Sequence, residues 1–207
     1  VHWLAVPASV ACCFIQGREL AREELHRLIR LIYPFMRKEL SMKWDLAAID
    51  DVTDQAIDAL TDLGILTRKR RGKLLVRPPT GSEKAYQLLM FGQAMVPMLQ
   101  RFYLAIAILV SNGSGTLTRA RLEVLCQQSA ERLSMIYGLH SPDFFNKTLF
   151  QDFVHTLHDL KILRRNEEGC LEFDEDITSI GADARLVLGE EIRHSILSLT
   201  TVEPSSE

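Results

Sequence analysis

The sequence predicts a mainly α-helical protein with two small β-hairpins, arranged as two winged-helix-like repeats. Three observations carry this prediction. Apolar residues recur at helical spacing over most of the chain. Two hairpin patterns occur, each with two short strands around a turn that ends in glycine, KRRG and NEEG. These patterns, at 58–76 and 155–173, are offset by 97 residues, and eight of their nineteen positions are identical.

The same offset relates the segments that precede the hairpins, LAREELHRLIRL (20–31) and LTRARLEVLCQQ (117–128). The identical pairs there are Leu20 and Leu117, Arg22 and Arg119, Leu25 and Leu122, and Leu28 and Leu125. One offset that holds across two separate blocks favours an internal duplication over coincidence. We therefore expect a first repeat at 1–97, a second repeat at 98–200 and a disordered tail at 201–207.

Each repeat is expected to contain the same elements in the same order. The expected helices, given for the first and then the second repeat, are an apolar helix (3–15, 98–111), an amphipathic helix (21–40, 118–137), a shorter helix before the hairpin (50–63, 143–160) and a final helix that begins near Thr80 or Ile177. Thr118 is a candidate N-cap. The final helix of the first repeat should run toward residue 96, where Pro97 is expected to kink or end it.

Composition and charge exclude some classes of protein. The 207 residues are 47% hydrophobic and 25% charged, as in an ordinary globular domain. A formal net charge of −3 gives the whole chain no basic footprint of the kind that nucleic-acid binders carry. The four cysteines form no C-x-x-C pair. We expect buried thiols in a reducing environment rather than a disulfide framework.

The beginning of the sequence and its longest apolar run set expectations about a parent protein. Val1 is not an initiator methionine, no signal peptide follows, and apolar residues are dense from the first positions. We therefore expect a fragment of a longer protein. The longest apolar run, 102–110, has nine residues, which is too short to span a bilayer. No transmembrane segment is expected in this chain.

A winged-helix outline raises the question of DNA binding, and the charges oppose it. The helix before the first hairpin would enter the major groove. Its sequence, DDVTDQAIDALTD (50–62), has five aspartates and no Lys or Arg, although Lys and Arg supply most non-specific DNA affinity. The second copy has one lysine, and its turn carries Glu167 and Glu168. No nucleic-acid partner is expected.

The first hairpin turn carries the candidate site for an anionic partner. Its basic residues are Arg68, Lys69, Arg70, Arg71 and Lys73. One interpretation is a solvated turn whose charges keep the hairpin from pairing edge to edge. The other is contact with lipid headgroups, an acidic carrier protein or another domain. Each basic residue near an anionic membrane gains about 1 kcal/mol, so five could matter together.

No catalytic constellation is visible in the sequence. His155 and His158 lie on one expected helix beside Asp159, but a zinc site needs further ligands. We expect partly exposed helix histidines. NGSG (112–115) lacks the P-loop lysine and the G-x-G-x-x-G spacing, which indicates a linker. No G-x-S-x-G elbow occurs. The sequence therefore predicts no metal site, cofactor or catalytic residue.

Two N-terminal blocks resemble a known family. VHWLAVPASVACCF (1–14) and ELAREELHRLIRLIYPFMRKEL (19–40) contain its characteristic residues, which are Trp3, Leu4, Pro7, Ala8 and Ser9, then a run of Leu, Ile and Arg before Tyr33 and Pro34. This pattern is similar to the C-terminal region of the membrane-associated glycerol-3-phosphate 1-O-acyltransferases, in their bacterial branch. The resemblance continues through LGIL (63–66) and the basic hairpin, so it covers most of the chain. It rests on overall pattern and short blocks, not on a catalytic signature.

The resemblance implies a parent enzyme of phospholipid biosynthesis, peripheral on the cytoplasmic side of the inner membrane. It would transfer a fatty acyl group from acyl-CoA or acyl-carrier protein to the sn-1 hydroxyl of glycerol 3-phosphate. In that family the chemistry lies in a separate, more N-terminal domain marked by H-x-x-x-x-D, whose His acts as general base. No His in this chain has Asp five residues later. The catalytic domain is therefore expected to be absent, and the fragment alone inactive.

Several roles remain open for this region. It could brace the catalytic domain of the same polypeptide, dock the enzyme on anionic lipid, or form a partner surface. The apolar helices 3–15 and 98–111 are expected to form the core, or one of them to supply an exposed contact patch. The alternative from another class is a tandem winged-helix interaction module of a regulator that binds protein or DNA. A free-standing enzyme would need a site that the sequence does not show.

Overall fold

The structure, a computed structural model, describes residues 2–137, 146–184 and 187–200. The chain divides into two compact units, Val1–Pro97 and Met98–Glu207. The mainly helical character and the two hairpins predicted from the sequence are confirmed. The expected disordered tail (201–207) and the first residues of the expected helix at 143–160 lie outside the described residues.

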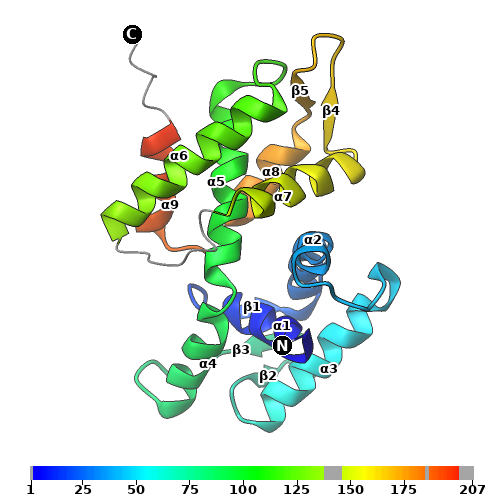
Figure 1. Cartoon of the computed structure of the whole chain (residues 1–207). Helices are drawn as coiled ribbons and strands as arrows, with labels where there is room; N and C mark the ends of the chain where they lie inside the picture. The colour runs from blue at the N-terminus through cyan, green and yellow to red at the C-terminus, as the bar shows by residue number, and fades with distance from the viewer. Residues whose placement is uncertain (1, 138–145, 185–186, 201–207) are drawn as a thin grey trace. The chain divides into compact units, whose positions relative to one another are not determined.

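The first unit contains four helices and a small sheet among its described residues. In chain order they are α1 (His2–Cys12), β1 (Glu19–Ala21), α2 (Arg22–Glu39), a 3-10 turn (Leu46–Ala48), α3 (Ile49–Asp62), β2 (Thr67–Lys69), β3 (Leu74–Val76) and α4 (Glu83–Gln93) (Figure 1). Helix α1 contacts α2, α3 and α4. Its apolar residues therefore lie among three other helices, which agrees with its expected place in the core.

The sheet of the first unit has one strand more than the predicted hairpin. β3 pairs antiparallel with both β2 and β1, giving the order β1-β3-β2. Glu19, Leu20 and Ala21 of β1 face Val76, Leu75 and Leu74 of β3. Three residues are too few to show the alternation that marks a strand, so the sequence analysis missed β1 and began the second helix at residue 21.

Helix α2 follows β1 directly and has one apolar face and one charged face. Leu25, Ile29 and Met36 are fully buried, while the opposite face carries charge. Glu23 and Glu24 lie in its first turn, and Arg37 and Lys38 lie in its last, which complements the helix dipole. The helix thus packs one stripe into the core and presents a row of ionisable side chains beside it.

The second unit repeats this order of elements without a complete third strand. Its elements are α5 (Val96–Asn112), α6 (Arg119–Tyr137), α7 (Lys147–Asp159), β4 (Leu163–Arg165), β5 (Leu171–Phe173), α8 (Asp176–Asp183) and α9 (Glu190–Thr200). β4 and β5 pair antiparallel. In place of a third strand, Thr118 forms one isolated bridge with Cys170, and the Leu171 N–H donates to the Leu117 carbonyl at 2.7 Å.

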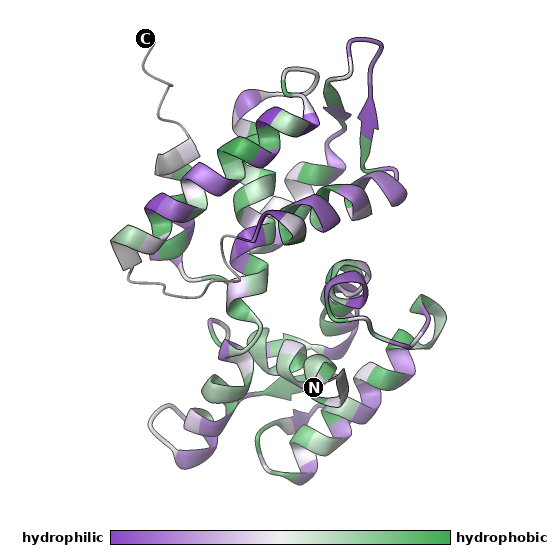
Figure 2. Cartoon of the chain, in the orientation of Figure 1, coloured by the Kyte–Doolittle hydropathy of each residue, from purple (hydrophilic) through white to green (hydrophobic). Residues whose placement is uncertain are grey.

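Helix α5 is the core helix of the second unit. Figure 2 shows that it is mostly hydrophobic along its length, whereas the turn of the hairpin β4–β5 is hydrophilic. Leu104, Ala105 and Leu109 are almost completely buried. Phe102 of α5 stacks on Phe153 of α7, with ring centroids 4.6 Å apart.

Helix boundaries differ from expectation at two places. The final helix of the first repeat ends at Gln93, and Pro97 lies in the first turn of α5 instead of ending α4. Proline is tolerated there because the first N–H groups of a helix have no partner within the helix. In the second unit, α8 ends at Asp183, and a separate helix, α9, follows it. Thr118 accepts a hydrogen bond from the Arg121 N–H at 3.3 Å, as its predicted capping role requires.

Candidate functional site

The turn of the first hairpin has an unusual backbone. Gly72 has a φ of 84°, as the sequence predicted, but Arg70 and Arg71 also have positive φ, 51° and 56°. Non-glycine residues rarely adopt this left-handed region, and such residues often mark functional sites. The Gly72 N–H donates to the Lys69 carbonyl at 3.0 Å, which closes the turn.

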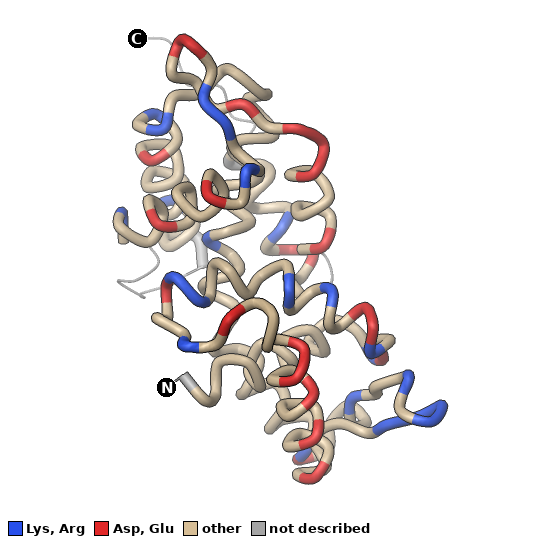
Figure 3. The backbone as a smooth tube through the Cα atoms, turned by 90° about the vertical axis from the view of Figure 1, so that its right-hand side faces the viewer, with Lys and Arg blue, Asp and Glu red and all other residues tan. Residues whose placement is uncertain are grey.

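Four of the five predicted basic residues carry unpaired charge. Arg68, Lys69, Arg70, Arg71 and Lys73 are all exposed, and Figure 3 shows this blue cluster projecting from its unit. Arg68 forms an ion pair with Asp58 of α3. Within the part of the chain that the structure describes, the other four make no ion pair. The hairpin therefore carries four cations available to an external anion.

A groove separates this turn from helix α2. It has a volume of about 410 Å³. Its lining residues are Arg22, Glu23, His26, Arg30, Arg71, Gly72 and Lys73. Of the predicted site residues, only Arg71 and Lys73 line it, whereas Arg68, Lys69 and Arg70 do not. The structure thus divides the basic cluster into two groups.

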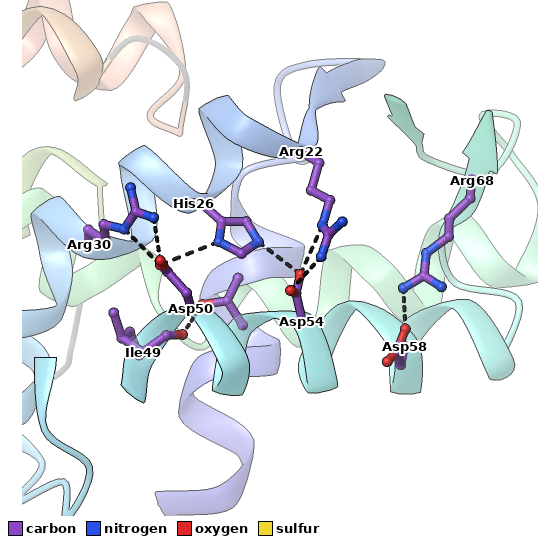
Figure 4. A network of polar contacts seen from close by, with 9 residues as sticks. Arg22, His26, Arg30, Ile49, Asp50, Asp54, Asp58 and Arg68 are labelled. Carbon is purple, nitrogen blue, oxygen red and sulfur yellow. Dashed lines mark hydrogen bonds and ion pairs between the residues drawn. The ribbon is translucent and has the colours of Figure 1, made fainter. Parts of the chain in front are cut away.

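The wall of the groove on α2 is fixed by a network with α3 (Figure 4). The Arg22 guanidinium grips Asp54 with two hydrogen bonds, at 2.9 and 2.5 Å. Arg30 also donates two hydrogen bonds to Asp50, and its Nε lies 2.7 Å from Oδ1. His26 lies between them, 2.9 Å from Asp54 and 3.4 Å from Asp50. The two arginines and the histidine are therefore held in defined positions.

The network also fixes the charges of its members. The hydrogen bond from Arg30 holds the pKa of Asp50 below its ordinary value, against an opposing effect of burial. Burial acts to raise the pKa of Asp54, but hydrogen bonds from Arg22 and His26 outweigh it, and the net pKa is lowered. The same hydrogen bonds raise the pKa of Arg22 and of Arg30. Both carboxylates and both guanidiniums thus stay ionised near neutral pH.

The aspartates of helix 50–62, which oppose DNA binding, have a structural role within their unit. In the structure, Asp50, Asp54 and Asp58 each pair with an arginine of the same unit. A signal was present: Asp50, Asp54 and Asp58 are four residues apart, as are Arg22, His26 and Arg30. Such spacing places each set along one face of a helix. It indicates two facing charged stripes.

A second pocket lies in the second unit and has a volume of about 260 Å³. Its polar lining residues are Arg119, His155, His158, Asp159 and Arg165. His155 and Asp159 form an i,i+4 pair at 2.8 Å, and both histidines are exposed, as expected. Among the described residues, no group of three or more His, Cys, Asp or Glu side chains could hold a metal ion.

Three of the four cysteines are buried, unreactive thiols. Cys12, Cys13 and Cys126 are buried, as the sequence predicted, whereas Cys170 is only partly buried. Burial raises the pKa of Cys12 to about 12 and also raises the pKa of Cys13 and of Cys126. A thiol that stays protonated at neutral pH is a poor nucleophile.

The described helices were also compared with the length of a membrane span. Taken singly, none of them combines the length and apolar composition needed to cross a bilayer. The consecutive helices α4 and α5 reach both only when counted together, and the helix is broken between them.

Comparison with known proteins identifies the family. The profile described as "Glycerol-3-phosphate acyltransferase C-terminal region" matches residues 1–166. The glycerol-3-phosphate acyltransferase of Pseudomonas paraeruginosa is 38% identical over 208 positions, which cover all of this chain and 25% of that protein. The protein of the same name from Xanthomonas campestris pv. campestris is 36% identical over 198 positions, covering 95% of this chain and 22% of that protein.

The chain spans about a quarter of the length of the curated relatives that it matches. The family resemblance predicted from the blocks at 1–14 and 19–40 is therefore confirmed. This chain belongs to the glycerol-3-phosphate acyltransferase family, and it corresponds to the C-terminal region of that family.

Proposed function

We propose that this chain is the non-catalytic C-terminal domain of an enzyme that acylates the sn-1 hydroxyl of glycerol 3-phosphate in phospholipid biosynthesis. The acyl donor would be acyl-CoA or acyl-carrier protein. One observation carries the proposal: the chain matches only a quarter of relatives named as acyltransferases. The absence of H-x-x-x-x-D from its sequence supports a non-catalytic role.

Within such an enzyme, the domain would brace the catalytic domain and help to dock it on the inner membrane. An exposed aromatic cluster supports the bracing role. Trp3 of α1 is 68% exposed and meets Trp44 edge to face, with centroids 5.3 Å apart. Leu4 beside it is also exposed. Exposed apolar groups of this size commonly mark contact surfaces.

The basic hairpin supports the docking role. Its four unpaired cations are presented on an exposed turn, where an anionic surface could approach them without displacing an internal carboxylate. Electrostatic attraction of this kind gains about 1 kcal/mol per basic residue and weakens with salt. Docking would be peripheral, on the cytoplasmic side.

We also infer that each unit is a winged-helix-like repeat. In the first unit, the hairpin β2–β3 follows three helices, and the sheet order β1-β3-β2 ties the strand before α2 to it. In the second unit, Thr118 holds the corresponding place with a single bridge to Cys170. These arrangements support a common ancestor of the two units. The internal pairing of the α3 aspartates does not supply the cations that DNA binding needs.

A chimera tests the catalytic assignment. The matching quarter of the Pseudomonas paraeruginosa relative would be replaced by this chain, and acylation of labelled glycerol 3-phosphate would be measured with each acyl donor. The chimera should be active, and this chain alone inactive. Transfer by this chain alone would overturn the non-catalytic assignment. Full activity of the relative after deletion of that quarter would overturn the bracing role.

Vesicle co-sedimentation tests docking. The chain would be mixed with neutral or anionic vesicles at low and high salt, in parallel with a variant in which Arg68, Lys69, Arg70, Arg71 and Lys73 are changed to Ser. Binding should require anionic lipid, weaken with salt and be lost in the variant. If the unmodified chain stays in the supernatant throughout, docking by this region is wrong and its cluster is a solvated turn.

A further inference from the structure

The groove between α2 and the hairpin turn differs from the rest of the basic cluster in its construction. On one side, Arg22 and Arg30 are fixed by bidentate contacts with Asp54 and Asp50. On the other side, Arg71 and Lys73 have no carboxylate partner within the described residues. Fixed donors on one wall and open charges on the other are the requirements of a preorganised anion site.

The charge balance of the groove indicates what kind of anion fits. The aspartates behind α2 neutralise Arg22 and Arg30, which leaves their outward N–H groups as donors but adds no net charge. Arg71 and Lys73 then contribute two positive charges to the lining. Glu23 is the single carboxylate in the lining, and it opposes an anion. With Glu23 counted, the lining keeps one net positive charge, but it offers more N–H donors than a carboxylate has acceptor oxygens to use. An anion with three or more acceptor oxygens therefore fits this groove better than a single carboxylate does.

The backbone of the turn gives a second reason for selectivity. Arg70, Arg71 and Gly72 occupy the left-handed region in succession, which is costly for the two arginines. The N–H groups of Gly72 and Lys73 donate within the turn, to the carbonyls of Lys69 and Arg70, so side chains and not backbone groups would hold an anion here. The strained turn places Arg71, Gly72 and Lys73 on the groove, and leaves Lys69 and Arg70 off its lining.

We propose that this groove binds a phosphate monoester, held between Arg71 and Lys73 of the turn and the guanidinium of Arg22, whose backbone N–H donates to the Lys73 carbonyl at 2.9 Å. The phosphate could belong to a lipid headgroup or to a soluble molecule. Acylation of glycerol 3-phosphate would leave a lipid that carries a phosphate monoester. The choice of the lipid source therefore rests on the proposed function, whereas phosphate binding itself does not.

Two matched double variants separate the groove from the general charge of the hairpin. Arg71→Asn with Lys73→Gln removes both open cations of the groove. Lys69→Gln with Arg70→Asn removes the same charge from the same turn but leaves the lining intact. Asn is chosen at the arginines because it tolerates positive φ better than most residues. Thermal unfolding curves of both would verify that the fold is retained.

The first measurement is a titration of this chain with inorganic phosphate at constant ionic strength, followed by amide NMR, with chloride as the reference anion. Phosphate should shift the Gly72 and Lys73 amides. The Arg71/Lys73 variant should weaken binding roughly tenfold or more, as expected for two charges. The Lys69/Arg70 variant should stay within about twofold, and Glu23→Gln should tighten binding by removing the opposing carboxylate. Equal losses of phosphate affinity in the two double variants, or no shift of the Gly72 amide, would overturn the proposal that this groove binds phosphate.

The second measurement identifies the source of the phosphate. Vesicles containing phosphatidate, which has a monoester headgroup, would be compared with phosphatidylglycerol vesicles of matched surface charge. Preference for phosphatidate that only the Arg71/Lys73 variant loses supports a lipid headgroup. If the chain binds inorganic phosphate but no vesicle, the ligand is a soluble phosphate. That result would overturn membrane docking and leave the phosphate site in the groove supported. Equal binding to both vesicles, lost equally in both variants, supports docking and overturns the groove.

Discussion

The two units join their second and third helices through polar side chains at corresponding positions, but with the charges exchanged. In the first unit, His26 of α2 contacts Asp50 and Asp54 of α3. At positions 97 residues later, Glu123 of α6 accepts a hydrogen bond from Gln151 at 2.9 Å and lies 4.0 Å from Lys147. His26 of the first unit and Glu123 of the second unit therefore occupy corresponding positions on their helices.

The exchange shows which feature of this helix pair is constrained. The central side chain is largely enclosed in both units, with 11% exposed for His26 and 9% for Glu123. An enclosed polar group requires hydrogen-bonding partners, and both units supply them from the third helix. Either sign of charge satisfies the requirement, so position is retained while polarity is not. This agreement supports the proposed duplication more specifically than shared leucines do.

The hairpin turns share a closing glycine but differ in backbone and in surface, because Arg70 and Arg71 have positive φ whereas the corresponding Glu167 and Glu168 do not. Both turns contain a glycine of positive φ, Gly72 and Gly169. The turn of the second unit carries Glu167 and Glu168, and the Asn166 side chain ties it by accepting from the N–H groups of Glu168 and Cys170. The turn of the first hairpin is basic and that of the second is acidic, so the proposed anion site belongs to the first unit.

The largest expected difference between the units is in how much the free energy of unfolding falls when a helix glycine is replaced. In the first unit, the glycine lies where α4 approaches α1 closely. A Cβ atom on Gly92 of α4 would lie 2.9 Å from backbone atoms of Cys12 in α1. Gly92→Ala should therefore lower the free energy of unfolding by roughly 3 kcal/mol, since backbone cannot yield as a side chain can. Urea denaturation measures the change.

Gly181→Ala in α8 is the matched control for this change. Its Cβ would lie 3.4 Å from the Ile106 side chain of α5, a contact that a small movement relieves. The higher helix propensity of alanine offsets it, so we expect a change within about 1 kcal/mol of zero. Equal losses for both variants would show that α1–α4 packing is no tighter than α5–α8 packing.

The next effect concerns the enclosed carboxylate of the second unit. Glu123→Ala removes the acceptor of Gln151 and the partner of Arg119, which donates to it at 2.9 Å. Both donors are only partly buried, but they would lose an enclosed, charged acceptor, which should cost roughly 2 kcal/mol. Asp54→Ala in the first unit should cost less, about 1 kcal/mol, because Asp54 is 31% exposed whereas Glu123 is 9% exposed, and His26 keeps Asp50 as a partner. The two variants are compared by chemical denaturation, and a larger loss for Asp54→Ala would contradict the ranking.

The acid dependence of stability should reveal the network of the first unit. The pKa of Asp50 and of Asp54 is lowered in the folded chain, so their stabilising effect is present above the unfolded pKa of about 3.9. It is lost as the pH falls below that value through the folded pKa. Asp54→Asn should therefore be less stable than the unmodified chain at pH 6, by about 1 kcal/mol or less after solvent screening. The difference should shrink toward pH 2.

That convergence is measured by denaturation at a series of pH values. A difference between Asp54→Asn and the unmodified chain that is constant from pH 6 to pH 2 would show that charge pairing does not contribute. Asn166→Ala in the second unit provides the comparison, because that side chain accepts from the backbone N–H groups of Glu168 and Cys170, which do not titrate.

The sequence predicted the elements better than the contacts between them. Helical periodicity located α2 and α6 to within a few residues, and glycine located both hairpin turns. β1 was missed because three residues carry too little pattern. The groove could not be foreseen, since it depends on the left-handed backbone of Arg70 and Arg71 and on where α2 lies beside the turn. The charged stripes of α2 and α3 can be recognised from the four-residue spacing in the sequence. Which arginine pairs with which aspartate depends on how the two helices cross.

The smallest expected effect compares the two hairpin turns at one position. Asn166 corresponds to Lys69 in the 97-residue offset, and its side chain accepts at 3.1 and 2.8 Å from two backbone N–H groups. Asn166→Ala should lower the free energy of unfolding by about 0.5–1 kcal/mol, because the turn is exposed and water replaces part of what is lost. Lys69→Ala should change it by no more than about 0.5 kcal/mol. Thermal unfolding of the two variants under identical conditions measures the contrast. If Lys69→Ala proved the more damaging, the first turn would depend on its side chains, and surplus charge available to an anion would be the wrong description of it.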